Sequence, residues 1–258
     1  MEIEVKTAPE PVPATEPAAR LDDVRRNFSM EKWHPKTGLG KKVKSGEITS
    51  IDEILDQGQR ILESEIVDAL VENLASDLMM IGQAKGKFGG GQRRVFKQTQ
   101  KKTAEGNKPS FSTCVIVGNK DGFVGIGFGK SRETVPAREK AIRNAKLNLI
   151  KIRRGCGSWQ CGCREPHSIP FAVSGKCGSS KIEILPAPKG TGLMVQKEAA
   201  KILATAGIKD AWSKTLGSTR TTTNLIRATE DALSKLLSTK LPAKYREQLG
   251  TIEGRAKR

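Results

Sequence analysis

The stretch RRGCGSWQCGCREPH, residues 153–167, holds the side chains of this sequence that are best suited to binding a metal. Cys156, Cys161, Cys163 and His167 follow one another with the spacing C-x4-C-x-C-x3-H. Three thiolates and one imidazole form a donor set that closed tetrahedral zinc sites use. The glycines between the cysteines supply the turns that converging ligands need. The spacing therefore predicts one structural zinc ion.

Other interpretations of the cysteines stay open. Cys177 could replace His167 as the fourth ligand, because the segment SGKCGSS turns the chain back. The thiols could also remain free on a surface that binds RNA. A redox or nucleophilic role has the least support, since the chain contains no C-x-x-C pair. Cys114 lies inside an apolar run and is expected to be a core residue.

The charge of the chain is positive and unevenly distributed. The net charge is +17, yet residues 1–80 contain 10 Lys and Arg against 16 Asp and Glu, and residues 81–258 contain 35 against 12. Basic side chains that neutralise phosphates release counterions, so the later part of the chain is expected to bind nucleic acid. No apolar run of about 18 residues and no signal-peptide pattern is present, which predicts a cytoplasmic protein without a membrane partner.

The first eighty residues predict an extension rather than a domain. Residues 1–48 are expected to form a disordered or extended basic arm, because the first 27 are rich in Pro, Ala and Glu and poor in aromatic side chains. Residues 49–80 predict a helical extension, in which Ser50 and Glu53 have the spacing of a capping box. The acidic outer faces of these helices should contact protein or solvent.

Residues 81–152 predict a β-β-α domain with a basic surface. A glycine-rich basic stretch is followed by two apolar runs that NKDG joins, which is a hairpin signal. Gly125, Gly127 and Gly129 alternate along the second run and leave one strand face bare, so another element should pack closely there. Ser131 is expected to cap the helix that follows.

The rest of the chain predicts a second domain after a Cys-rich linker at 153–167. Residues 168–238 show a β-β-α-β-α pattern, in which HSIPFAVSG and SKIEILPAP read as strands and Gly207 closes the first helix. The last helix carries one apolar stripe, formed by Leu225, Thr229, Leu233 and Leu236. The basic tail at 239–258 is expected to be mobile. The fold class is therefore α+β.

Three long segments resemble a known family. PSFSTCVIVGNKDGFVGIGFGKSRETVPAREKAIRNAKLNL, PHSIPFAVSGKCGSSKIEILPAPKGTGL and AGIKDAWSKTLGSTRTTTNLIRATEDALSKL resemble the S-five (S5) family of small-subunit ribosomal proteins. The N-terminal helices and the cysteine insertion resemble its archaeal branch. The resemblance covers residues 88–238. It implies that residues 81–152 are similar to a double-stranded-RNA-binding domain and that residues 168–238 have the fold of the S5 second domain.

The resemblance also implies a function. S5 proteins are structural constituents of the small subunit that contact 16S rRNA near the decoding centre and the messenger RNA entry channel, beside the S4 and S8 proteins. A basic hairpin of the family affects accuracy, and it corresponds here to Arg93, Arg94, Phe96, Lys97 and residues 98–109. The family carries the histidine of the PH pair even where these cysteines are absent, which keeps the role of His167 open.

Twelve side chains are expected to contact RNA, because phosphate contacts hold a protein on folded RNA without reading its sequence. All but one are basic, and they lie in the glycine-rich stretch, after the glycine strand, in the linker and in the second domain. They are Arg93, Arg94, Lys97, Lys101, Lys102, Lys130, Arg132, Arg153, Arg154, Lys189, Arg220 and Thr222.

Two further function classes compete with the ribosomal one. GIGFGKS fails the P-loop pattern, because position 124 is valine where that motif requires glycine. PAPKGTGL could bind an anion at the start of a helix, yet no acidic metal-binding residue accompanies it, so an RNA phosphate is the expected anion and the chain is not expected to be an enzyme. A free RNA chaperone is the other alternative, and a high-salt wash of small subunits would remove it.

Overall fold

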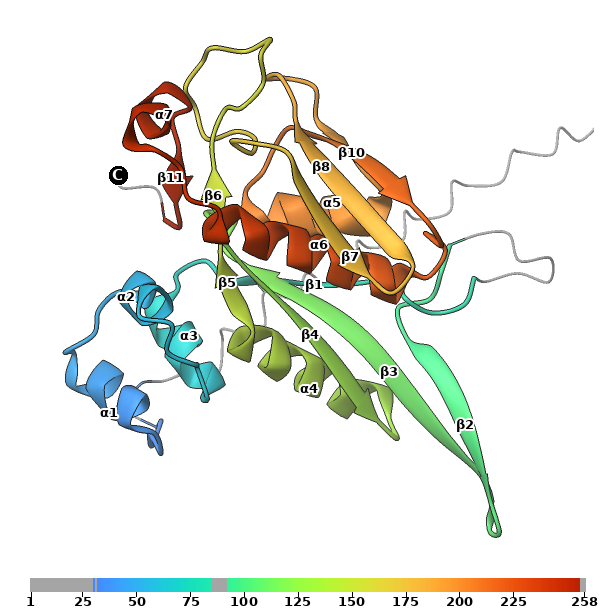
Figure 1. The fold of residues 1–258 in the computed structure, drawn as a ribbon. Helices are drawn as coiled ribbons and strands as arrows, with labels where there is room; N and C mark the ends of the chain where they lie inside the picture. Colours follow the sequence, from blue (N-terminus) through green and yellow to red (C-terminus); the bar gives the residue numbers. More distant parts are fainter. Residues whose placement is uncertain (1–29, 31, 85–91, 256–258) are drawn as a thin grey trace, which may run out of the picture.

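The computed structural model describes Met30, residues 32–84 and residues 92–255 of the 258-residue chain (Figure 1). Most of the predicted N-terminal arm and part of the glycine-rich stretch lie outside these residues. The mixed helix and strand content confirms the α+β class. Among the residues that the structure describes, every helix is too short or too polar to span a bilayer.

Three short helices precede the first domain: α1 (Gly38–Ser45), α2 (Ile51–Asp56) and α3 (Ser64–Leu70). Helix α1 corrects the prediction that residues 1–48 are extended throughout. Thr37 caps it by accepting a hydrogen bond from the Gly40 amide, and the chain leaves it at Gly46. Because Gly46 has a φ of +82°, which glycine adopts without strain, the helix ends there.

The first sheet is antiparallel and holds its strands in the order β1-β3-β4-β5, with β2 also paired to β3. Strand β1 lies inside the predicted helical extension and pairs with β3, with Ala75 opposite Gly118. The domain therefore begins before residue 81, where the sequence placed its boundary. The strands are β1 (Ala75–Leu78), β2 (Lys97–Thr103), β3 (Gly106–Gly118), β4 (Phe123–Ser131) and β5 (Leu149–Lys151).

Helix α4 (Thr134–Leu147) covers the glycine face of β4, as close packing against that face predicted. A Cβ atom on Gly125, Gly127 or Gly129 would overlap the backbone of this helix. The bare face therefore lets a helix backbone approach a strand more closely than side chains permit. The predicted cap was wrong, since Glu133 precedes the helix and makes no side-chain capping bond.

The second sheet has the order β7-β8-β10-β9 and confirms the predicted β-β-α-β-α pattern with one short strand added. The first predicted strand, which started at His167, begins only at Val173, so residues 167–172 are not part of it. Gly207 ends helix α5 with a φ of +87°, as predicted. The elements are β7 (Val173–Cys177), β8 (Ser180–Pro186), β9 (Leu193–Met194), α5 (Lys197–Ala206), β10 (Ala211–Leu216) and α6 (Thr222–Ser238).

The two domains share one hydrophobic core. Cys114 and Ile116 of β3 and Ile126 of β4 belong to the same buried cluster as residues of α5, α6 and the second sheet. In Figure 1, α5 and α6 accordingly lie between the two sheets, while α4 covers the outer face of the first. The predicted stripe on α6 is fully buried in this core. Cys114 is a core residue, as expected.

The N-terminal helices dock on the first domain. Helices α1 to α3 surround a second apolar cluster that includes Phe123 and Leu149 of the first sheet. Lys151 forms ion pairs of 2.8 Å with Asp52 and 3.0 Å with Asp56 of α2. Burial alone would lower the pKa of Lys151, but its hydrogen bonds to these two carboxylates outweigh burial and raise it. The acidic residues of the extension thus serve partly to hold it on the domain.

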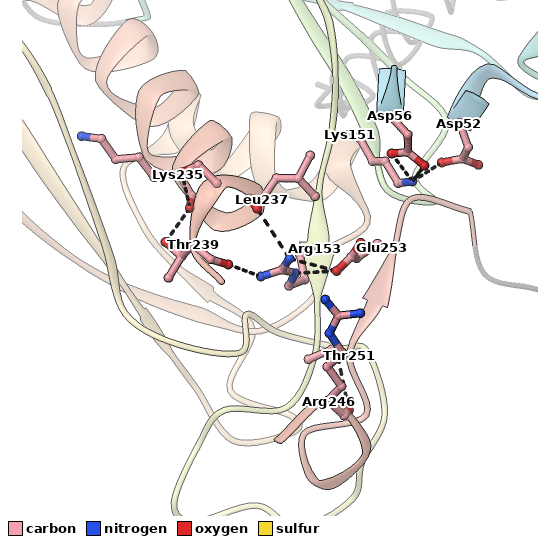
Figure 2. Close-up of polar contacts among 11 residues, drawn as sticks. Asp52, Asp56, Lys151, Arg153, Lys235, Leu237, Thr239, Arg246, Thr251 and Glu253 are labelled. Carbon is pink, nitrogen blue, oxygen red and sulfur yellow. Dashed lines mark hydrogen bonds and ion pairs between the residues drawn. The ribbon is translucent and has the colours of Figure 1, made fainter. Parts of the chain in front are cut away.

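The start of the linker between the domains, residues 153–156, is buried rather than exposed. Strand β6 (Arg153–Arg154) pairs with β11 (Ile252–Glu253), which the chain reaches after helix α7 (Ala243–Gln248). Figure 2 shows the Arg153 guanidinium between Glu253, at 3.0 Å from its Nε, and the Thr239 carbonyl, at 2.7 Å. The prediction of a mobile tail was therefore wrong for the described residues after 242, because this tail supplies partners to a buried cation.

We expect the replacement Gly127→Ala to destabilise the protein by about 3 kcal/mol or more, because the new methyl group would force α4 away from β4. Gly38→Ala is the matched control, since nothing lies within 4 Å of a Cβ atom at that helical position. The control should change stability by less than about 1 kcal/mol. Urea titration of both variants measures the difference, and equal stabilities would contradict the close-packing argument.

We expect Arg153→Ala to cost about 2–3 kcal/mol, because it removes charge-assisted hydrogen bonds of a buried guanidinium to the half-exposed Glu253 and to the Thr239 carbonyl. The Arg153 side chain is only 5% exposed. Arg255→Ala removes a second arginine pair of the C-terminal segment, with Glu72, but there the arginine side chain is 52% exposed. That control should cost at most about 1 kcal/mol. Unfolding free energies that fall equally in both variants would contradict the structural role of the linker.

Candidate metal centre and RNA-facing surface

The structure brings the four predicted metal ligands together. The ligand atoms of Cys156, Cys161, Cys163 and His167 all lie within 4.8 Å of one another. Tetrahedral zinc with Zn–S bonds of ~2.3 Å would place its sulfur ligands ~3.8 Å apart, so this donor set could close around the ion with a small contraction. Cys161 Sγ already lies 3.8 Å from His167 Nε2. The cluster therefore fits one structural metal ion.

A buried carboxylate orients the histidine. Asp210 Oδ2 lies 2.8 Å from His167 Nδ1, and the two side chains are 6% and 4% exposed. A proton on Nδ1 that is donated to Asp210 leaves the lone pair of Nε2 directed toward the sulfur atoms. Histidine ligands of metal ions commonly hold a carboxylate in this way. Sequence reasoning missed Asp210, which lies 43 positions from His167 and has no nearby ligand pattern.

The thiols of the cluster differ in acidity. Hydrogen bonds from the backbone amides of Lys189 and Cys163, together with the Cys163 thiol, lower the pKa of Cys161 to about 6. Burial, followed by hydrogen bonding with Cys163 and Cys161, raises the pKa of Cys156 to about 11. At neutral pH Cys161 is therefore a thiolate, and hydrogen-bond donors around it stabilise its negative charge. A negative sulfur in a ring of thiols and an imidazole suits a cation.

Cys177 does not join the cluster. It ends strand β7, where it pairs with Ser180 of β8. Among the described residues the candidate metal group contains His167 and not Cys177. The geometry therefore favours the histidine as the fourth ligand over the alternative that the sequence left open.

The loop PAPKGTGL does not offer its amides to an external anion. The amides of Gly190 and Gly192 donate to Asp210 Oδ1 at 3.1 and 2.8 Å. Helix α5 begins later, at Lys197, and Gln196 caps it by accepting bonds from two of its first amides. The expectation that an RNA phosphate binds this loop at a helix start is corrected, because protein groups already satisfy the donors.

The predicted RNA-binding side chains separate into exposed and buried groups. Eight lie on the surface and could reach phosphates: Arg94, Lys97, Lys101, Lys102, Lys130, Arg132, Lys189 and Arg220. Lys189 is paired with Glu165 at 2.6 Å, which neutralises part of its charge. Lys108, exposed on the opposite strand of the hairpin, lies within the predicted hairpin segment 98–109 but was not among the twelve side chains named.

Three of the predicted residues meet at the base of the hairpin. Arg93 donates to the hydroxyl of Thr222 at 3.3 Å and to the carbonyl of Arg220 at 3.1 Å. These contacts join the start of β2 to the start of α6. Thr222 is 6% exposed, so the prediction that its hydroxyl contacts RNA is corrected: it accepts a hydrogen bond from Arg93.

The prediction that Arg153 and Arg154 contact RNA is also corrected. They are 4% and 5% exposed, and their guanidinium groups are paired inside the protein. Arg154 donates to Asp121 at 2.6 Å and to the Gly254 carbonyl at 3.1 Å. Two consecutive arginines beside a cysteine cluster resemble a surface for phosphate in the sequence, but here they hold the junction between the domains together.

Comparison with known proteins agrees with the resemblance. The family model described as Ribosomal protein S5, N-terminal domain, matches residues 92–153, and that described as Ribosomal protein S5, C-terminal domain, matches residues 175–246. Small ribosomal subunit protein uS5 of Methanocaldococcus jannaschii is 48% identical over 228 residues, which are 88% of this chain and 98% of the relative.

Two other archaeal relatives with the same name match to a similar extent. The protein of Nanoarchaeum equitans is 48% identical over 226 residues, covering 88% of this chain and 97% of the relative. That of Methanothermobacter thermautotrophicus is 46% identical over 224 residues, covering 87% and 97%. With both domains matched in order, the chain belongs to the ribosomal protein S5 family and is of the archaeal type.

Proposed function

We propose that this chain is a structural constituent of the small ribosomal subunit that binds 16S rRNA near the decoding centre and the messenger RNA entry channel and supports translational accuracy. Membership of the S5 family and the names of its archaeal relatives support the ribosomal role. The place on the subunit and the neighbours, S4, S8 and messenger RNA, are carried over from the family resemblance.

The observation that carries RNA binding is the β2–β3 hairpin. It projects beyond the body of the protein (Figure 1), and its side chains between residues 97 and 109 are almost all exposed. Four lysines against one glutamate line it: Lys97, Lys101, Lys102, Lys108 and Glu105. Lys101 and Lys108 are direct partners across the two strands.

This arrangement is only partly neutralised in the isolated protein, because Lys108 is paired with the exposed Glu105 while the hairpin keeps four lysines against one glutamate. Like charges directly opposite each other on a β-ladder repel, and a two-stranded ribbon without a packed face is marginal in water. A phosphate between or beside the lysines attracts both of them and so replaces their repulsion with attraction. Its neutralisation also releases counterions from the nucleic acid. The hairpin is therefore suited to lie on a polyanion. Phosphate contacts of this kind position a protein on folded RNA.

The Cys156, Cys161, Cys163 and His167 cluster is proposed to hold one zinc ion. The ion would supply a closed cross-link within the linker, from Cys156 near its start to His167 at its end. Asp210 contributes by fixing the ring of His167 and by binding the Gly190–Gly192 loop through its other oxygen. The cluster thus joins three separate segments, which small protein domains commonly achieve with structural zinc.

Purified full-length protein should contain about one zinc per chain, measured by elemental mass spectrometry. Cys161→Ser should abolish binding, because it removes one of four ligands. Cys177→Ser is the matched control and should keep its zinc, since Cys177 lies outside the cluster. A natively folded wild-type protein that holds no metal and whose thiols react freely would sink the zinc proposal and leave the free-thiol interpretation.

The double replacement Lys101→Gln and Lys102→Gln should weaken binding to salt-stripped small-subunit particles. It should also reduce the slope of log affinity against log salt by about 2, roughly one for each phosphate that a lysine no longer neutralises. Lys41→Gln with Lys42→Gln, another pair of adjacent exposed lysines, should leave the slope unchanged. Co-sedimentation across a potassium chloride series measures both. An unchanged slope in the hairpin variant would place the RNA contacts elsewhere.

Particles that retain the wild-type chain after a high-salt wash would support a resident ribosomal protein. Complete loss of the chain in that wash would favour the alternative, a free RNA chaperone.

A further inference from the structure

Trp159 makes little contact with the rest of the protein and does not contribute to its core. Its residue surface is 88% exposed, the largest value among the exposed large apolar residues of the described chain. The other two tryptophans are used in packing: Trp33 is buried and donates from Nε1 to Glu63 at 3.1 Å, and Trp212 is half-buried. A large ring held in water costs hydration free energy, so an exposed tryptophan often marks an interaction site.

The backbone that carries Trp159 is held rigidly. Residues 158–161 form a turn in which the Cys161 amide donates to the Ser158 carbonyl at 3.2 Å. Ser158 is buried, and its hydroxyl accepts from the Gln160 amide at 3.4 Å. Cys156 Sγ lies 3.2 Å from the Cys161 carbonyl oxygen, so these two cysteines bracket the turn. Trp159 and Gln160 are therefore the two apical residues of a turn whose flanks belong to the cysteine cluster.

Rigid presentation lowers the cost of binding. A ring on a mobile loop would lose conformational entropy when it docks, whereas a ring on a fixed turn has lost most of it during folding. The cluster of Cys156, Cys161, Cys163 and His167 thus has a second consequence besides cross-linking. It fixes the backbone position from which an exposed aromatic side chain projects.

The cysteine cluster that flanks the turn has exposed cationic neighbours. Arg164 follows Cys163 in the chain, the Lys189 amide is hydrogen-bonded to Cys161, and the Lys209 amide donates to the His167 carbonyl at 2.8 Å. The carboxylate among them is Glu165, which is paired with Lys189. The residues beside Trp159 in the chain are serine, glutamine and glycine. A protein-binding hot spot is usually surrounded by contacts that exclude water, and this loop offers few of them. A single exposed ring next to a cluster with cationic neighbours is better matched to a nucleobase and its phosphates.

We propose that Trp159 stacks on an unpaired nucleobase of the small-subunit rRNA, held in place by the turn that the cysteine cluster anchors. This inference rests on the proposed function, because it assumes that the chain binds rRNA. Stacking on an aromatic ring tolerates any base, since every base has a π-face. The contact would therefore strengthen binding and fix the register of the second domain on the RNA without reading sequence.

The test uses full-length protein and salt-stripped small-subunit particles. Trp159→Ala should weaken rebinding by roughly 5- to 150-fold, the range for removing one stacked base, while Trp159→Phe should retain most of the affinity. Leu62→Ala removes another exposed apolar side chain, 67% exposed, and should bind as wild type does. Chemical probing of the rRNA should find at least one base that wild type and Trp159→Phe protect and Trp159→Ala does not. Circular dichroism and zinc content, each equal to wild type, confirm that the variants fold.

The outcomes separate this inference from the function it rests on. Wild-type affinity in Trp159→Ala, with the particles still binding the chain tightly, overturns the stacking proposal alone. Weaker binding in Trp159→Ala without any change in base reactivity also overturns it, in favour of a protein partner. If wild-type protein itself does not bind the particles, the proposed function fails together with the inference.

Discussion

The buried arginines of the linker are the constraint on which the rest of the structure depends. A guanidinium group cannot lose its charge in a protein, so in the interior it must find carboxylates and carbonyl oxygens. Arg153 finds Glu253 and the end of α6, and Arg154 finds Asp121 and Gly254. The loop between β3 and β4, the last turn of α6 and the C-terminal strand are thereby brought to one place.

The cysteine cluster depends on that junction. Cys156 follows the arginine pair by two positions, and its amide donates to the Leu249 carbonyl of the same C-terminal segment. From there the chain runs to His167 and to Asp210, which also binds the loop at Gly190 and Gly192. One carboxylate therefore serves a candidate metal ligand and a glycine loop at once. The burial of this carboxylate is tolerated because both of its oxygens have hydrogen-bond partners inside the protein.

Charge on this protein is divided between two uses that look alike in the sequence. Lysines 146 and 151 are buried and paired with acidic residues of the N-terminal helices, so their charge stabilises the docking of that extension. Lys101 and Lys108 are cross-strand partners on an exposed hairpin in which four lysines meet one glutamate, paired with Lys108, so the excess of like charge there opposes the folded state. An excess of like charge that destabilises the fold locally indicates a surface that binds a partner outside the chain.

Local patterns in the sequence determined most of the elements of this fold. The alternation of Gly125, Gly127 and Gly129 predicted a close contact, because a strand face without side chains leaves room only for a backbone. Other local patterns were also confirmed. They are the buried stripe on α6, the end of α5 at Gly207 and the convergence of the four spaced metal ligands. Only the tertiary structure decided which charged side chains are buried and paired and which are exposed. Arg153 and Glu253 are 100 positions apart, and residue type states that a side chain is charged but not whether a partner will bury it. The role of Asp210, the place of strand β1 and the docking of the C-terminal tail depend on such distant pairs, which hydrophobic periodicity and ligand spacing do not record.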